Sequence, residues 1–126
     1  GFVMRRAVQR HIAIFSRLIP EMTPTQFAAL AKLCELGHAS QNELGRLTAM
    51  DVATVKGVVD RLRARSLISS APLESDKRRL MLTPTLRGRT LYRKYAPRAT
   101  EVTRQTLGPL DHGERRQLMQ LLERLT

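Results

Sequence analysis

The charged residues best suited to contact a polyanion lie in the middle of the chain. The run Asp76-Lys77-Arg78-Arg79 lies between two short strand-like segments, and a helical pattern that Asp51 can cap precedes both. This order is typical of a winged helix-turn-helix, in which one helix enters the major groove of DNA and a cationic hairpin tip contacts the neighbouring backbone or minor groove. The sequence from Ser40 to Thr83 is therefore predicted to bind DNA.

Basic charge is concentrated in the same region. The chain carries a net charge of +11, and residues 56–104 hold 13 basic and 4 acidic side chains. Of the 22 basic side chains 18 are Arg, whose planar guanidinium suits phosphates and guanine edges. Charge alone is equally compatible with a solvated surface. Binding to an acidic membrane is disfavoured, because no amphipathic helix has an apolar face rich in Trp and Phe.

The composition predicts one cytoplasmic domain with an aliphatic core. The 126 residues include no Trp, 2 Tyr and 3 Phe. No apolar run is long enough to span a membrane, and no segment resembles a secretory signal. Cys34 is the only cysteine, which excludes an internal disulfide and a thiolate zinc cluster. The three histidines are too scattered for a metal motif, so we expect neither a metal nor a cofactor.

Capping residues and apolar spacing predict a mostly α-helical chain with a small β-hairpin. Helices are expected at residues 2–19, 24–36, 41–47, 52–65 and 86–110 and from 112 onward, with strands at 67–71 and 80–83. The predicted caps are Thr23, Ser40, Asp51, Thr85 and Asp111, three of them as capping boxes with Gln26, Glu43 and Glu114. The predicted inward side chains are Phe27, Leu30, Ala31 and Cys34, then Leu44 and Leu47, then Val55, Val58, Val59 and Leu62.

The helices at the two ends of the chain are predicted to form a dimerisation stem. The winged helix-turn-helix accounts for residues 23–83, which leaves apolar-striped helices at 1–19 and 85–126 without a matching surface. A homodimer in which these helices interleave would cover the stripes and share its two-fold axis with a palindromic DNA site. The alternative is a monomer whose terminal helices close its own core.

Taken together, these segments resemble the MarR (multiple antibiotic resistance regulator) family of transcription factors. The resemblance rests on the helix Leu44–Leu47, the stretch Ala53–Leu62, the wing Asp76–Arg79 and the helix start Thr85–Gly88, and it covers nearly the whole chain as a single domain, 1–126. It implies a homodimeric regulator, in our interpretation a repressor, that binds pseudo-palindromic double-stranded DNA and is released by a small aromatic acid.

The resemblance also implies roles for individual residues. The residues that would face bases are Ala53, Thr54, Lys56 and Gly57, and those that would lie near phosphates are Ser40, Gln41, Arg61 and Arg63. In the wing, Arg78, which stands between Lys77 and Arg79 in the sequence, would enter the minor groove, and Asp76 would brace the turn. The effector would lie near His11, Phe15, Phe27, Met50 and Tyr92. The stretch Leu47–Gly57 is most similar to regulators of nicotinic acid breakdown, which makes a hydroxylated nicotinate a candidate effector.

Three residues depart from the family pattern. Ser66 stands where Gly usually follows the recognition helix, so a left-handed conformation there would cost roughly 1 kcal/mol. Pro84 is expected to shorten the second wing strand. Pro97 is expected to kink or interrupt a helix that the family keeps continuous.

Several alternatives remain open at this level. Cys34 could be a redox switch, although its register favours a buried core thiol. His11 could be an ordinary helix histidine bonded to solvent or to a partner protomer. An enzyme is disfavoured, because no nucleophile elbow, phosphate-binding glycine loop, metal motif or paired carboxylates can be found. The rival binding functions are a sequence-indifferent architectural DNA protein and a winged helix used for protein contacts, and the Arg-rich wing disfavours the latter.

Overall fold

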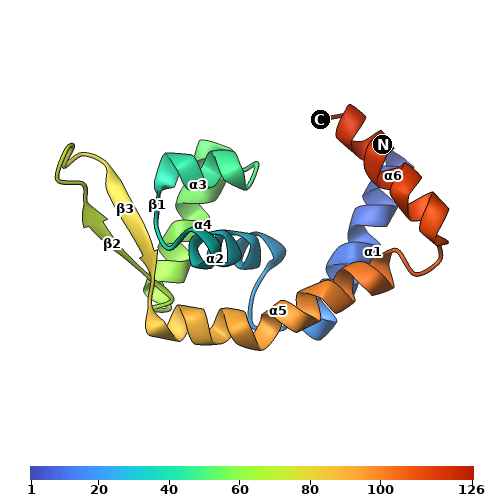
Figure 1. The fold of residues 1–126 in the computed structure, drawn as a ribbon, viewed down its shortest axis with the longest axis horizontal. Helices are drawn as coiled ribbons and strands as arrows, with labels where there is room; N and C mark the ends of the chain where they lie inside the picture. The colour runs from blue at the N-terminus through green and yellow to red at the C-terminus, as the bar shows by residue number, and fades with distance from the viewer.

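A computed structural model describes all residues, 1–126, as six helices and three short strands (Figure 1). The elements in chain order are α1 (Phe2–Leu18), α2 (Pro24–Leu36), β1 (Ala39–Ser40), α3 (Gln41–Leu47), α4 (Val52–Ala64), β2 (Ile68–Pro72), β3 (Leu80–Pro84), α5 (Leu86–Thr106) and α6 (His112–Arg124). One lobe contains α2, α3, α4 and the sheet, and the long helix α5 connects it to an arm that contains α1 and α6. No helix combines the length and apolarity that crossing a bilayer requires.

Side-chain caps start the helices where the sequence predicts them. The Thr23 hydroxyl accepts a hydrogen bond from the Gln26 backbone N–H at 3.2 Å, and the Gln26 side chain accepts one from the Thr23 N–H at 3.3 Å. Each cap satisfies donors that the first helical turn leaves unpaired. Ser40 caps α3 by accepting from the Glu43 N–H, but the Glu43 side chain does not return the bond, so this predicted box is only half formed.

The sheet has the strand order β1-β3-β2, and all pairs are antiparallel. The β2–β3 hairpin runs in register from Ile68 opposite Pro84 to Pro72 opposite Leu80. The prediction that Pro84 shortens this strand is wrong. The Thr85 N–H donates to the Leu67 carbonyl, so the nitrogen of the adjacent Pro84 faces away from β2. On its other side β1 pairs only with Met81 and Leu82, so neither neighbouring strand needs the missing N–H of Pro84. Strand β1 was not predicted, because two residues carry no periodic signal.

The buried core is centred on α2. Its fully buried side chains include Ala29, Leu30 and Leu33, whereas the predicted residues Phe27, Ala31 and Cys34 are half-buried. The sequence of α2 is apolar on two overlapping stripes, and contacts with α3, α4, α5 and β3 decide which stripe is covered most completely. The four predicted inward residues of α4 are all buried. Leu47 was predicted to point inward but is 40% exposed.

Two backbone predictions have different outcomes. Ser66 has φ of 59°, which confirms a left-handed residue after α4 without the glycine that would favour it. Pro97 does not interrupt α5, which continues as one helix from Leu86 to Thr106. The proline lies on the exposed side of the helix, where water can replace the backbone partner that it removes.

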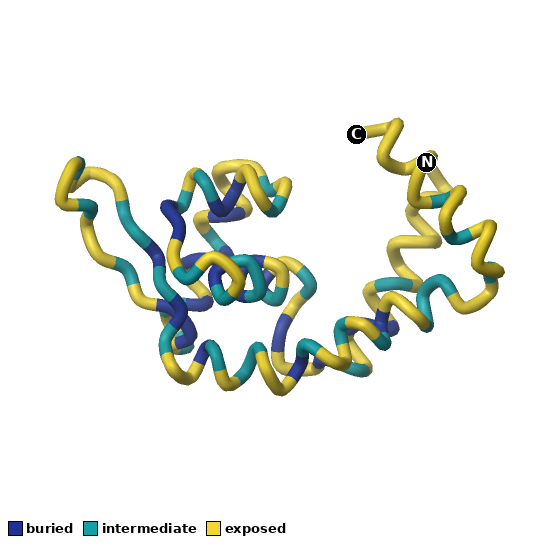
Figure 2. Tube along the Cα trace, viewed as in Figure 1, coloured by how far each residue is buried: buried dark blue, intermediate teal, exposed yellow.

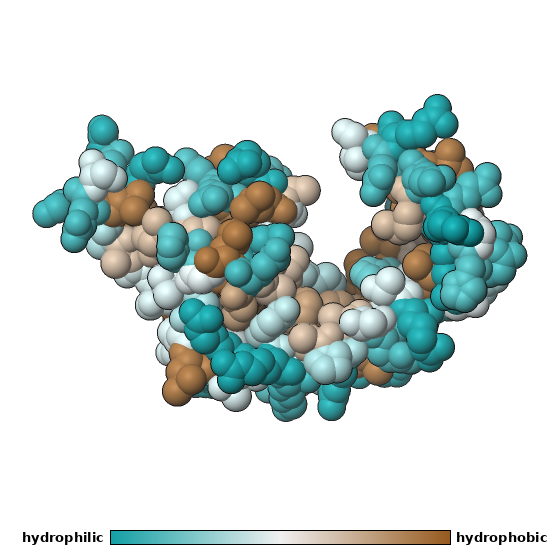
Figure 3. All heavy atoms as spheres, in the orientation of Figure 1, coloured by the Kyte–Doolittle hydropathy of each residue, from teal (hydrophilic) through white to brown (hydrophobic).

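The terminal helices leave much apolar surface uncovered. Helix α1 packs on α5, but α1 buries only Ile14 and Phe15, and α6 has no buried residue. Figure 2 shows the buried residues gathered in the lobe and along α5, and Figure 3 shows apolar side chains on the surface of the α1 and α6 arm. The exposed large apolar residues of these two helices are Phe2, Val3, Met4, Val8, Ile12, Met119, Leu121 and Leu122.

Replacing Gly88 by Ala is expected to destabilise the protein by roughly 2–3 kcal/mol. A Cβ on Gly88 would lie 2.0 Å from the Leu67 carbonyl oxygen, and backbone atoms cannot yield as a flexible side chain can. Gly57→Ala is the control, since its added methyl would meet only the Arg61 guanidinium at 3.8 Å. Urea unfolding at one fixed protein concentration measures both changes, and equal stability of the two variants would contradict the close approach.

Candidate nucleic-acid interface

Helix α4 presents a surface with few bulky side chains. Asp51 caps the helix by accepting from the Thr54 N–H at 2.7 Å, and the buried valines on its other side hold it against the lobe. Ala53, Thr54 and Lys56 are exposed, and Gly57 is half-buried. Small side chains at the start of the helix allow its backbone to come close to the floor of a DNA groove.

Ion pairs hold part of the α4 charge in place. The Asp60 carboxylate lies 3.0 Å from the Lys56 ammonium and 3.4 Å from the Arg63 guanidinium. Arg63 also donates to the Ser70 hydroxyl at 3.1 Å, which connects α4 to β2. The Arg61 side chain is exposed and makes no hydrogen bond or ion pair with the protein, so its guanidinium is free to bind a phosphate.

The wing turn is held together by Asp76. Its carboxylate accepts from the Arg78 backbone N–H at 3.1 Å and from the Arg78 side chain at 3.3 Å, and its carbonyl accepts from the Arg79 N–H at 3.0 Å. The Arg79 carbonyl accepts a hydrogen bond from the Leu73 N–H, which closes the base of the loop. The Arg78 side chain is nonetheless 93% exposed, so the turn is ordered while its cation projects into solvent.

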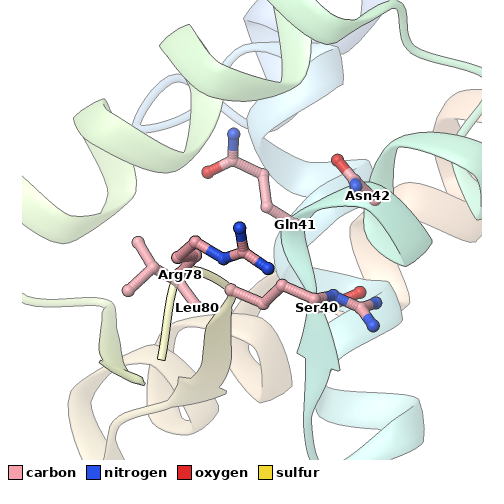
Figure 4. Close-up of a pocket in the computed structure, with 6 residues that line it drawn as sticks. Ser40, Gln41, Asn42, Arg78 and Leu80 are labelled. Atoms are coloured by element: carbon pink, nitrogen blue, oxygen red, sulfur yellow. The ribbon is translucent and has the colours of Figure 1, made fainter. Parts of the chain in front are cut away.

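The wing and the start of α3 enclose a small hollow of about 170 Å³ (Figure 4). Ser40, Gln41 and Asn42 line one side, and Arg78 and Arg79 line the other. The two groups of predicted DNA contacts, more than 30 residues apart in sequence, therefore meet at one basic surface. Asn42 was not among the predicted contacts, although it directly follows the predicted contacts Ser40 and Gln41 in the sequence.

Four of the five predicted effector residues form a continuous aromatic row. The ring centroids of His11 and Phe15 are 6.5 Å apart, those of Phe15 and Phe27 are 6.1 Å apart, and those of Phe27 and Tyr92 are 5.9 Å apart. The row runs from α1 through α2 to α5, so the terminal helices α1 and α5 both contact helix α2 of the lobe through it. Met50 packs at the edge of the buried core, and no ring contact connects it to the row.

His11 and Cys34 have defined environments. The His11 Nδ1 atom lies 3.0 Å from the Thr106 hydroxyl, which connects α1 to the end of α5. Partial burial raises the pKa of the Cys34 thiol, and the nearby charges of Arg89 and Arg93 offset this only in part. A protonated, half-buried thiol reacts poorly with oxidants, so the environment favours the structural interpretation of Cys34.

A cluster around Glu21 connects the α1–α2 loop to α4 and α5, and no local sequence pattern predicts it. The Glu21 carboxylate accepts from the Tyr95 hydroxyl and from Lys94, and these bonds lower its pKa. The Glu21 carbonyl accepts from Arg65, the residue that ends α4, at 2.7 Å. Arg98 donates to the Leu18 carbonyl nearby. The junction of stem and lobe is therefore fixed by polar contacts on its exposed side.

Known proteins are similar to this chain in both sequence and fold. The MarR family model matches residues 22–80. The HTH-type transcriptional repressor NicR of Pseudomonas putida is 37% identical over 127 aligned residues, which cover 99% of this chain and 80% of NicR. The chain belongs to the MarR family. The predicted family is thereby confirmed, and this MarR protein is a DNA-binding transcriptional regulator.

Two solved structures are similar to this MarR protein over its full length. A probable transcriptional regulator from Pseudomonas aeruginosa has 46% identity and a TM-score of 0.95, with 100% of this chain and 96% of that chain covered. BpsR of Bordetella bronchiseptica has 38% identity and a TM-score of 0.90, with 99% and 96% covered, and its structure concerns regulation of its DNA binding by 6-hydroxynicotinic acid. The winged helix-turn-helix fold is confirmed, as is the prediction that the chain is not an enzyme, because MarR regulators are not enzymes.

Acidification is expected to remove the stabilisation that Asp51 gives to the start of α4. Hydrogen bonds from Thr54 lower the pKa of the Asp51 carboxyl below its ordinary 3.8. Because the folded pKa is depressed, this stabilisation is complete above pH 3.8 and is lost as the pH falls through the lowered value. Asp51→Asn keeps a capping side chain without the titration. Urea midpoints between pH 2 and pH 6 should therefore fall less steeply for Asp51→Asn than for the wild type, and parallel curves would contradict this role.

Proposed function

We propose that this MarR protein is a repressor that binds a pseudo-palindromic operator as a homodimer and is released by a small aromatic acid. The observation that carries the proposal is the basic surface that the start of α3 shares with the wing and its exposed cation Arg78. Helix α4, whose exposed side carries mostly small and polar residues, is connected to the wing strand β2 by the bond from Arg63 to Ser70, and these are the elements that a groove-binding surface requires.

The proposed contacts divide between bases and backbone. The residues that face the major groove are Ala53, Thr54, Lys56 and Gly57. Those that lie along phosphates are Ser40, Gln41, Arg61 and Arg63. The adjacent minor groove is reached by Lys77, Arg78 and Arg79, whose turn is held by Asp76. Lys56 and Arg63 are paired with Asp60 in the free protein. These pairs are exposed and worth little in water, so exchanging them for DNA contacts costs little.

The proposed dimer is formed by the terminal helices. Residues 1–19 and 85–126 would form the stem and residues 23–83 the DNA-binding lobe of one domain, 1–126. The eight exposed large apolar residues of α1 and α6 support this division, because apolar side chains gathered on one arm are typical of a protein–protein contact. A two-fold axis through the stem would place the two α4 helices in successive major grooves, about 34 Å apart.

The proposed effector is an aromatic acid of the hydroxylated nicotinate class. The aromatic row from His11 to Tyr92 offers ring faces and one imidazole between stem and lobe. The relation of BpsR to 6-hydroxynicotinic acid supports the same ligand class here. An effector releases DNA only if it binds more tightly to a dimer whose α4 helices no longer match the groove spacing.

Selection from genomic DNA tests the central proposal. Purified protein is mixed with fragmented DNA of its source organism at about 150 mM salt, where non-specific binding is weak, and the retained fragments are sequenced. Enrichment of one palindromic motif supports an operator-binding dimer. Retention of DNA without any common motif would instead favour a sequence-indifferent architectural protein and contradict the proposal.

Arg78→Ala is expected to weaken binding to the selected operator by about 1–3 kcal/mol, because it removes the exposed wing cation. Asp76 and Arg79 keep the turn closed through backbone bonds that the substitution leaves in place. Arg93→Ala is the matched control, since Arg93 is an exposed arginine on α5 outside the proposed interface. Fluorescence anisotropy at fixed salt compares the two, and an equal loss of affinity would show that only overall charge matters.

His11→Ala is expected to raise the concentration of 6-hydroxynicotinic acid that releases half of the bound operator by about tenfold, which corresponds to the loss of roughly one hydrogen bond to a charged group. Gln9→Ala, an exposed change on the same helix, should leave that concentration unaltered. The measurement is operator release in a ligand titration. Release at the wild-type concentration by His11→Ala would remove this residue from the effector site.

A further inference from the structure

A cavity separate from the DNA surface and from the aromatic row lies at the junction of lobe and stem. Its volume is about 410 Å³, and it is bounded by the α1–α2 loop, the end of α4 and the first turns of α5. None of the residues of the aromatic row lines it, and none of the proposed DNA contacts does. Tyr92, the residue of α5 that belongs to the row, does not line the cavity, whose α5 residues are Leu86, Arg87, Thr90, Leu91 and Lys94, so the two features occupy different sides of this helix.

The charge lining the cavity is positive and incompletely paired. Arg65, Arg87 and Lys94 contribute three cations, and Glu21 contributes the single carboxylate. Lys94 donates to this carboxylate at 3.2 Å, and Arg65 donates to the Glu21 carbonyl, which carries no net charge. Arg87 makes no hydrogen bond or ion pair with the protein. The Arg87 guanidinium is thus free to bind a ligand, and the charge of Arg65 is not neutralised, because its partner is an uncharged carbonyl.

An apolar wall lies beside these cations. Leu67 is buried beneath the cavity, Leu91 is half-buried, and Leu86 is 77% exposed at the first position of α5. An exposed leucine next to an unpaired arginine offers complementary surfaces to one molecule that has both an apolar body and a negative charge. The volume is within the range of small-molecule sites. A bare phosphate would leave the leucines unused, and an uncharged ring would leave the guanidinium unpaired.

We propose that this cavity binds a small organic anion with an apolar body, whose carboxylate pairs with Arg87 and whose body packs on Leu86 and Leu91. The bound anion also comes within the field of Arg65 and Lys94, the two side chains that connect α4 and α5 to the Glu21 loop. Occupancy would draw these cations away from Glu21 and so alter the contact between lobe and stem. This site is additional to the proposed effector row and does not depend on it.

Benzoate serves as the probe, with acetate as an anion that lacks the ring and benzamide as a ring that lacks the charge. Backbone amide NMR shifts of the full chain are followed during each titration up to 10 mM. We expect benzoate to shift the amides of Arg65, Thr90 and Leu91, while acetate and benzamide shift them at least tenfold less strongly at equal concentration. Equal shifts by acetate would mean an adventitious anion only, and shifts confined to His11, Phe15 and Phe27 would place the ligand in the aromatic row instead; either result overturns the proposal.

Matched arginine variants distinguish specific binding at the cavity from general attraction of benzoate to a positively charged protein. Arg87→Ala should weaken benzoate binding at the cavity by about tenfold, because it removes a charge-assisted pair. Arg93→Ala removes the same charge from the same helix without lining the cavity and should leave the benzoate affinity unaltered. Equal weakening in both variants would overturn the proposal. His11→Ala should retain benzoate binding at the cavity, so failure of the effector row and failure of this site give different results.

Discussion

The structure depends on one close approach between two backbone segments. The Leu67 carbonyl accepts the Thr85 N–H at 3.0 Å, the Ser66 carbonyl accepts the Thr85 hydroxyl at 2.7 Å, and Gly88 leaves room for the first turn of α5 to lie directly against Leu67. The end of α4, the start of β2, the end of β3 and the start of α5 meet here. The directions of the recognition helix, the wing and the stem helix are therefore set relative to one another by a few backbone contacts.

The basic side chains fall into two groups with different freedom. Lys56, Arg63 and Lys94 are paired with carboxylates, so their positions are partly defined before any ligand arrives. Arg61 and Arg87 have no protein partner. A preformed pair lowers the entropy lost on binding, whereas a free arginine contributes attraction at longer range. On α4, two cations are therefore held by Asp60 while Arg61 stays unpaired, and on α5 Lys94 is held by Glu21 while Arg87 stays unpaired.

Much of the fold follows from local sequence. Caps such as Thr23 and Asp111 are read from a few neighbouring residues and depend little on the rest of the chain, which is why the helix starts were predicted correctly. The prediction for the buried side of α2 included Phe27 and omitted Leu33, because both belong to apolar stripes and only the packed neighbours decide which stripe is covered. The sheet partner of Met81 was missed for a related reason, since strand β1 is defined by pairing and not by its own two residues.

The candidate site shows the same division between local and long-range information. The wing cations follow from a run of adjacent residues, and the resemblance to the MarR family supplied their roles. Glu21 and Tyr95, which bond in the Glu21 cluster, are 74 positions apart, and no local sequence pattern predicts their contact.

In the proposed homodimer, helix α6 would be completed by the second copy of the chain. A helix of 13 residues that buries none of its side chains is only marginally stable in water. If the proposed dimer covers the leucines of α6, ordering of this helix and association of two chains are one equilibrium. Helix content would then change with protein concentration, and dilution alone would lower DNA occupancy, without any small molecule.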